Sequence, residues 1–151
     1  MWQRIQTVFL AITILALLIS LVQPVWVYTG GESGDSAILT PFYLLQNGTY
    51  QYMPFSLTAI LSVAAATMAF TSIRKYKNRV LQMKLGAFNS LFLAGVIGSS
   101  LYFAMALMKQ FQGGQYGLGF FLPAVSVICN LIANFFIRKD ERLVRDSGRL
   151  R

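Results

Sequence analysis

Four long apolar runs dominate this sequence, and they lie at residues 5–22, 55–73, 85–108 and 118–137. A hydrocarbon core about 30 Å thick is crossed by roughly 17–25 helical residues, and every run falls within that window. Charged residues make up only 12% of the chain, which is about half their share in a soluble domain. The runs therefore predict an all-α membrane protein, a four transmembrane helix bundle that occupies residues 1–151 as a single domain.

The first apolar run begins next to Arg4, as the apolar part of a secretory signal peptide would. It is longer than the roughly 7–15 residues of such a segment, and a signal peptide also ends in a small-residue cleavage site. The residues that follow, Gln23-Pro24-Val25-Trp26, do not form such a site. We therefore interpret this run as an uncleaved signal-anchor helix.

The basic residues between the runs predict the orientation of the helices. Five Lys and Arg residues lie in the segment 74–84, and six lie in the tail 138–151. The first outer loop, residues 24–54, has none, and the loop between the third and fourth runs has only Lys109. Because loops rich in Lys and Arg stay in the cytoplasm, we expect both termini and the middle loop to be cytoplasmic.

The first outer loop is too long to be a simple turn. Its aromatic segments 42–45 and 49–52 flank Gln46-Asn47-Gly48, and Asn-Gly between such segments is a strong hairpin signal. We therefore expect a small β-hairpin in this loop.

Aromatic side chains recur close to the predicted outer boundary of the membrane. Such residues commonly anchor helices at the level of the lipid headgroups. We interpret them as an aromatic belt, comprising Trp26, Tyr28, Tyr50, Tyr52, Tyr102 and Tyr116.

The chemistry available inside the four runs is narrow. The chain has no histidine and one cysteine, Cys129. The runs contain no Asp, Glu, Lys, Arg or His, the side chains that mark proton relays and ion pathways in membranes. We therefore predict that the protein is not an enzyme and has no catalytic residue, no bound cofactor and no metal site.

Three asparagines are the main polar side chains that we single out within the runs. Asn130 and Asn134 are four residues apart and share one helix face, while Asn89 lies in the third run. They either line a polar groove for a substrate or lipid headgroup, or form interhelical hydrogen bonds, each contributing roughly 0.6–2 kcal/mol. We favour the interhelical hydrogen bonds.

The C-terminal tail, residues 138–151, mixes six basic with three acidic residues. Glu141 and Arg145, like Arg142 and Asp146, are spaced to form ion pairs along a helix. The tail is therefore expected to extend the fourth helix by two or three turns and to end it near Ser147-Gly148. It serves either as a charged flank attracted to anionic lipid or as a docking segment for a partner.

The docking hypothesis assigns partner contacts to basic residues of the tail and of the middle loop. The net charge of +8 alone would also suit a nucleic-acid partner, but direct nucleic-acid binding is not expected because the basic residues flank membrane spans. The residues assigned to docking are Arg142, Arg145, Arg149 and Arg151 in the tail, and Arg74, Lys75, Lys77 and Arg79 in the loop.

Three segments resemble a known family. They are Arg4-Ile5-Gln6-Thr7, residues 76–85 and residues 137–151, and together they are similar to small four-helix bacterial inner-membrane proteins known only as a domain of unknown function. The resemblance implies a bacterial cytoplasmic membrane, and it supplies no reaction, substrate or site residue.

The sequence thus favours a non-enzymatic membrane accessory or scaffold subunit that docks partners through its basic loop and tail. Its expected partners are membrane lipids and other membrane or cytoplasmic proteins in a complex. The alternative is a carrier or channel-like oligomer for a small neutral or lipidic substrate, built around the three asparagines.

Overall fold

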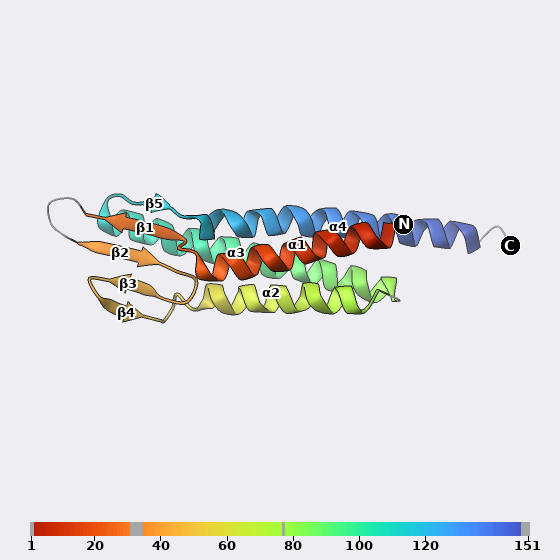
Figure 1. The fold of residues 1–151 in the computed structure, drawn as a ribbon, viewed down its shortest axis with the longest axis horizontal. Helices are drawn as coiled ribbons and strands as arrows, with labels where there is room; N and C mark the ends of the chain where they lie inside the picture. The colour runs from red at the N-terminus through yellow and green to blue at the C-terminus, as the bar shows by residue number, and fades with distance from the viewer. Residues whose placement is uncertain (1, 31–34, 77, 149–151) are drawn as a thin grey trace.

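Four helices run along the long axis of the molecule in the computed structural model, which describes residues 2–30, 35–76 and 78–148 (Figure 1). They are α1 (Trp2–Val22), α2 (Leu57–Arg74), α3 (Arg79–Phe111) and α4 (Leu118–Gly148). Each is long and apolar enough to cross a membrane. The four candidate spans indicate a multi-pass membrane protein.

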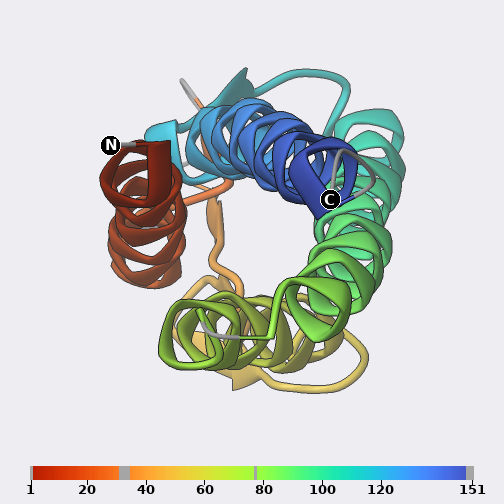
Figure 2. The same cartoon turned by 90° about the vertical axis from the view of Figure 1, so that its right-hand side faces the viewer.

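The helices form a ring in which each one packs against its two chain neighbours, and α4 closes the ring onto α1 (Figure 2). Small side chains lie where the helices meet. Leu10 of α1 packs on Ala69 of α2 and Ala133 of α4, and Leu17 packs on Ala65 and Leu93. The small alanines let the helix backbones approach closely, as is common between helices in membranes.

Helix α3 is longer than the apolar run that predicted it. The side chain of Asn78 accepts a hydrogen bond from the backbone N–H of Leu81 (3.1 Å) and caps the helix, so α3 begins at Arg79. Hydropathy detects only the part of a helix that suits lipid, whereas capping decides where the helix starts.

A five-stranded antiparallel sheet lies at one end of the bundle, which we call the sheet end (Figure 1). The strand order is β4-β3-β2-β1-β5. The strands are β1 (Trp26–Thr29), β2 (Ser36–Leu39), β3 (Leu44–Gln46), β4 (Thr49–Gln51) and β5 (Gln115–Tyr116).

The predicted hairpin is confirmed as β3 and β4, joined by Asn47-Gly48 with φ of 48° and 82°. Positive φ at both central residues is what a two-residue hairpin turn needs. The prediction was incomplete, however, because the hairpin is only one edge of the sheet. The far edge is β5, which comes from the loop between α3 and α4 and pairs with β1 through Trp26↔Tyr116 and Val27↔Gln115.

Trp26 corrects the interpretation of the aromatic belt. Its side chain is 0% exposed and belongs to the core between the sheet and α3, with Phe103 and Leu107. Its ring also lies 5.8 Å from that of Phe111, centroid to centroid. Trp26 is therefore the centre of the sheet-end core and not a residue at the lipid boundary.

Candidate functional site

Helix α4 continues as one helix beyond the rest of the bundle at the end opposite the sheet, which we call the charged end (Figure 1). We refer to its residues 138–148 as the tail helix. At 1.5 Å per residue this segment is about 16 Å long. The predicted helical tail is confirmed as far as Gly148, the last residue that the structure describes, and the predicted end near Ser147-Gly148 stays a prediction.

An ion pair joins the root of the tail helix to the first residue of α3. The Nη2 atom of Arg79 lies 3.3 Å from Oδ2 of Asp140, and Nη1 of Arg79 donates a hydrogen bond to the carbonyl oxygen of Asp140 (3.0 Å). Both side chains are partly buried, at 23% and 15% exposure. Exposed ion pairs contribute only about 0–1 kcal/mol, so the main effect of this contact is to fix the rotation of α4 relative to α3.

The spacing of the charges along the tail helix places them on two faces. Glu141 and Val144 line a groove of about 530 Å³ on the side of α3, together with Asn78, Arg79 and Val80. A second groove of about 370 Å³ is lined by Phe135, Arg138, Lys139 and Arg142. We call this second groove the basic groove. Asp140 and Glu141 are directed toward α3, and among the side chains that the structure describes no carboxylate lines the basic groove.

The structure places the residues of the docking hypothesis in different surroundings. Arg142 and Arg145 are exposed on the tail helix, and Arg74 and Lys75 are exposed at the end of α2. Arg79 instead has a partner within the chain, so the ion pair with Asp140 occupies a side chain that was expected to contact a partner. Lys77, Arg149 and Arg151 lie outside the described residues.

The three asparagines come together in the bundle interior, between α3 and α4. The Nδ2 atom of Asn89 donates to Oδ1 of Asn130 (2.8 Å), and Nδ2 of Asn130 donates to Oγ of Ser90 (2.9 Å). The Nδ2 atom of Asn134 donates to the carbonyl oxygen of Gly86 (3.1 Å). All three asparagine side chains are at most 9% exposed, so these hydrogen bonds join the two helices away from the surface.

Sequence reasoning missed Gly86, which makes this contact possible. A Cβ atom at Gly86 would overlap the side-chain amide of Asn134. The missing side chain therefore provides the space in which Asn134 reaches the backbone of α3.

Sequence reasoning also missed a polar face of α1. Gln6, Thr13 and Ser20 recur every seven residues and are all buried, which is the spacing of one helix face. Thr13 and Ser126 of α4 exchange hydrogen bonds, because each hydroxyl donates to the backbone carbonyl of the other residue (3.4 and 3.3 Å). The seven-residue spacing was the available signal.

Several buried polar acceptors have no hydrogen-bond partner among the described residues. They include Oε1 of Gln6, Oε1 of Gln82, Oδ1 of Asn89 and Oδ1 of Asn134. Nε2 of Gln82, by contrast, donates to the carbonyl oxygen of Ser72 (3.2 Å). The interior is thus rich in amide oxygens that can accept hydrogen bonds.

Residues 2–150 match a family model described as Domain of unknown function (DUF4293). The chain belongs to this family. The family resemblance expected from the sequence is therefore confirmed over nearly the whole chain, tail included. No curated protein matches this DUF4293 chain.

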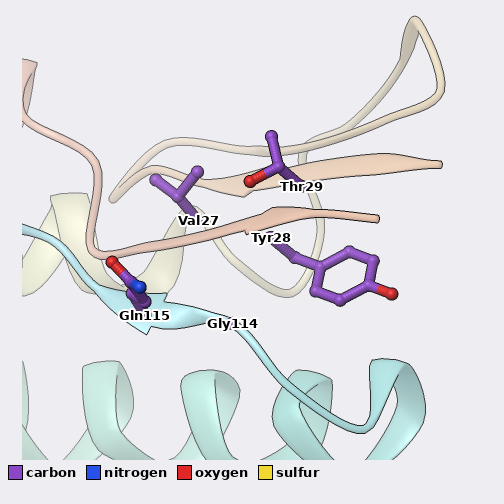
Figure 3. A pocket seen from close by; sticks show the side chains of 5 residues that line it. All are labelled: Val27, Tyr28, Thr29, Gly114 and Gln115. Carbon is purple, nitrogen blue, oxygen red and sulfur yellow. The ribbon is translucent and has the colours of Figure 1, made fainter. Parts of the chain in front are cut away.

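The sheet end of this DUF4293 protein contains a smaller pocket of about 280 Å³ between β1 and β5 (Figure 3). Its lining residues are Val27, Tyr28, Thr29, Gly114 and Gln115. They present an amide, a phenol and a hydroxyl, and no carboxylate or amine.

Metal ligands are not clustered in the described part of this DUF4293 chain. Within residues 2–30, 35–76 and 78–148, no three Asp, Glu or Cys side chains gather closely enough to hold a metal ion.

Proposed function

We propose that this DUF4293 protein is a non-enzymatic accessory or scaffold subunit of the bacterial cytoplasmic membrane, whose tail helix docks an acidic partner. The observation that carries the proposal is the uninterrupted α4, which extends past the bundle with Arg142 and Arg145 exposed. The ion pair of Arg79 with Asp140 supports it, since it directs an acidic residue away from the basic face.

The tail helix suits docking because it is already ordered within the chain. A segment that folds on binding loses part of its binding free energy to ordering, and a preformed helix avoids much of this loss. Complementary charge mainly raises the association rate and the specificity of such contacts. The proposed partner therefore presents an acidic surface to the basic face of the tail helix.

The proposal places both termini and the loop between α2 and α3 in the cytoplasm. The Lys and Arg residues near the charged end support this orientation. A reporter enzyme that works only in the cytoplasm should be active when it is fused after Asn78. A reporter enzyme that works only outside the cytoplasm should be active when it is fused after Gly34. Cytoplasmic activity of the Gly34 fusion would contradict the orientation.

A chain that ends at Val144 tests the docking role. It keeps Asp140 and the basic groove but removes Arg145 and everything beyond it. We expect the same amount of protein in the membrane and the loss of proteins that cross-link to the full-length chain. Binding of these proteins should also weaken at high salt, because screening shortens from about 10 Å at 0.1 M to about 3 Å at 1 M ionic strength.

Two substitutions at Arg145 keep the length of the chain, and the one that also keeps the charge is the matched control. Arg145→Lys should retain the cross-linked proteins, and Arg145→Glu should lose them. An unchanged set of cross-linked proteins in the shortened chain would contradict docking by the distal tail. Purification as a homo-oligomer with no other protein would instead favour the second candidate, a carrier or channel-like oligomer for a small neutral or lipidic substrate. The unpartnered amide oxygens in the interior support that candidate.

A further inference from the structure

We propose that the basic groove at the root of the tail helix binds the phosphate headgroup of an anionic phospholipid. The inference rests on the insertion of the bundle in a membrane and is independent of whether the distal tail docks a protein. It assigns the groove to Phe135, Arg138, Lys139 and Arg142.

The spacing of these residues places them on one face of α4. Positions i, i+3, i+4 and i+7 lie within two helical turns and share a face. Phe135 is 63% exposed and lies in the last turn of the apolar run, where a lipid chain would cover it. Arg138 follows at the end of that run and Arg142 lies one turn further on, so the groove changes from apolar to basic along the helix.

The charges around the groove favour a phosphate diester. Arg138 and Arg142 are both exposed, and a guanidinium can bind two phosphate oxygens at once. Two neighbouring carboxylates lie elsewhere: Asp140 pairs with Arg79, and Glu141 lines the groove beside α3. Among the side chains that the structure describes, a phosphate in the basic groove would therefore meet cations and no carboxylate of the groove lining.

Phe135 is the reason to assign a lipid and not a soluble phosphate. Its exposed apolar ring would gain nothing from contact with a small hydrated anion. The acyl chain of a phospholipid would pack against the ring while the headgroup contacts the arginines. Basic residues next to a membrane already attract anionic lipids, at about 1 kcal/mol per residue. The groove adds a fixed geometry to this attraction.

The test compares lipid retention by two variants of equal charge. The full-length chain is reconstituted in phosphatidylcholine nanodiscs with or without phosphatidylglycerol, and native mass spectrometry measures the phosphatidylglycerol that stays bound. Arg138→Gln/Arg142→Gln should lower this retention by more than the roughly five-fold for each residue that the general attraction of basic residues near a membrane supplies. Arg74→Gln/Lys75→Gln removes the same charge from an exposed site outside the groove and should lose no more than this general attraction.

Further arms identify the source of the phosphate and check folding. Arg138→Lys/Arg142→Lys keeps the charge and should lose less lipid than the glutamine variant, with unchanged helix content by circular dichroism. Soluble glycerol phosphate should not displace the bound lipid. An equal loss in both glutamine variants would reduce the effect to general surface charge and overturn the proposal. Displacement by glycerol phosphate would also overturn it, and so would retention unaffected by Arg138→Gln/Arg142→Gln.

Discussion

Replacing Gly86 with alanine should destabilise the bundle by about 1–3 kcal/mol, the usual cost of overpacking a core. A Cβ atom there would overlap the side-chain amide of Asn134, so either this amide would have to leave its position or α3 and α4 would have to separate. Either movement would also weaken the hydrogen bond from Asn134 to the carbonyl oxygen of Gly86. Reversible unfolding in mixed detergent micelles measures the change in the free energy of unfolding.

Gly98→Ala is the matched control in the same helix. No atom lies within 4 Å of a Cβ built at Gly98, and alanine favours helix more than glycine does by about 1 kcal/mol. This variant should be neutral or slightly stabilising. Asn134→Ala should partly rescue Gly86→Ala, because it removes the overlapping amide and makes the two changes non-additive. Equal losses in Gly86→Ala and Gly98→Ala would show that α3 and α4 do not cross at Gly86.

Replacing Gly114 with alanine should have the second large effect, confined to the sheet end. Gly114 has φ of 104°, and holding alanine in such a conformation costs about 1–3 kcal/mol. A Cβ at this position would also overlap the indole ring of Trp26, which adds the cost of overpacking. The side chain of Trp26 and strand β5 would then shift, and the sheet should become more susceptible to proteolysis.

Substitutions at Gly48 and Gly113 allow the cost of the positive φ to be measured apart from the cost of overpacking. Gly48 has φ of 82° but open space around it, so Gly48→Ala carries only the backbone cost. A Cβ at Gly113 would make ordinary contact with Tyr28 at 3.6 Å, so Gly113→Ala should change little. The loss of stability should therefore rank Gly114 above Gly48 and Gly48 above Gly113, measured by thermal unfolding and by limited proteolysis. If Gly114→Ala matched Gly113→Ala, Trp26 would not pack on this loop.

Features that arise from local sequence were predictable. The four helices follow from apolar runs, the hairpin from Asn47-Gly48, and the helical tail from the spacing of Glu141 and Arg145. Each of these signals lies within a few residues of the structure that it predicts.

Features that depend on distant partners were not predictable in the same way. Strand β5 has two residues and exists because it pairs with β1, almost ninety positions earlier in the chain. Trp26 was assigned to the membrane boundary because nothing near it in sequence reveals that the sheet covers it. The basic character of the tail was visible, but the ion pair that joins Asp140 to Arg79 at the start of α3 depends on a residue about sixty positions earlier in the chain.

The continuity of α4 has a mechanical consequence. Between Pro123 and Gly148 the helix contains no proline or glycine, the residues at which helices most often kink. Near its start, the backbone N–H of Gly119 donates to the carbonyl oxygen of Pro24 (3.0 Å), which joins it to the segment leading into β1. The part of α4 from Pro123 to the tail helix is therefore free of the usual kink sites, and the orientation of the tail helix is tied to a helix whose first turn is joined to the sheet end.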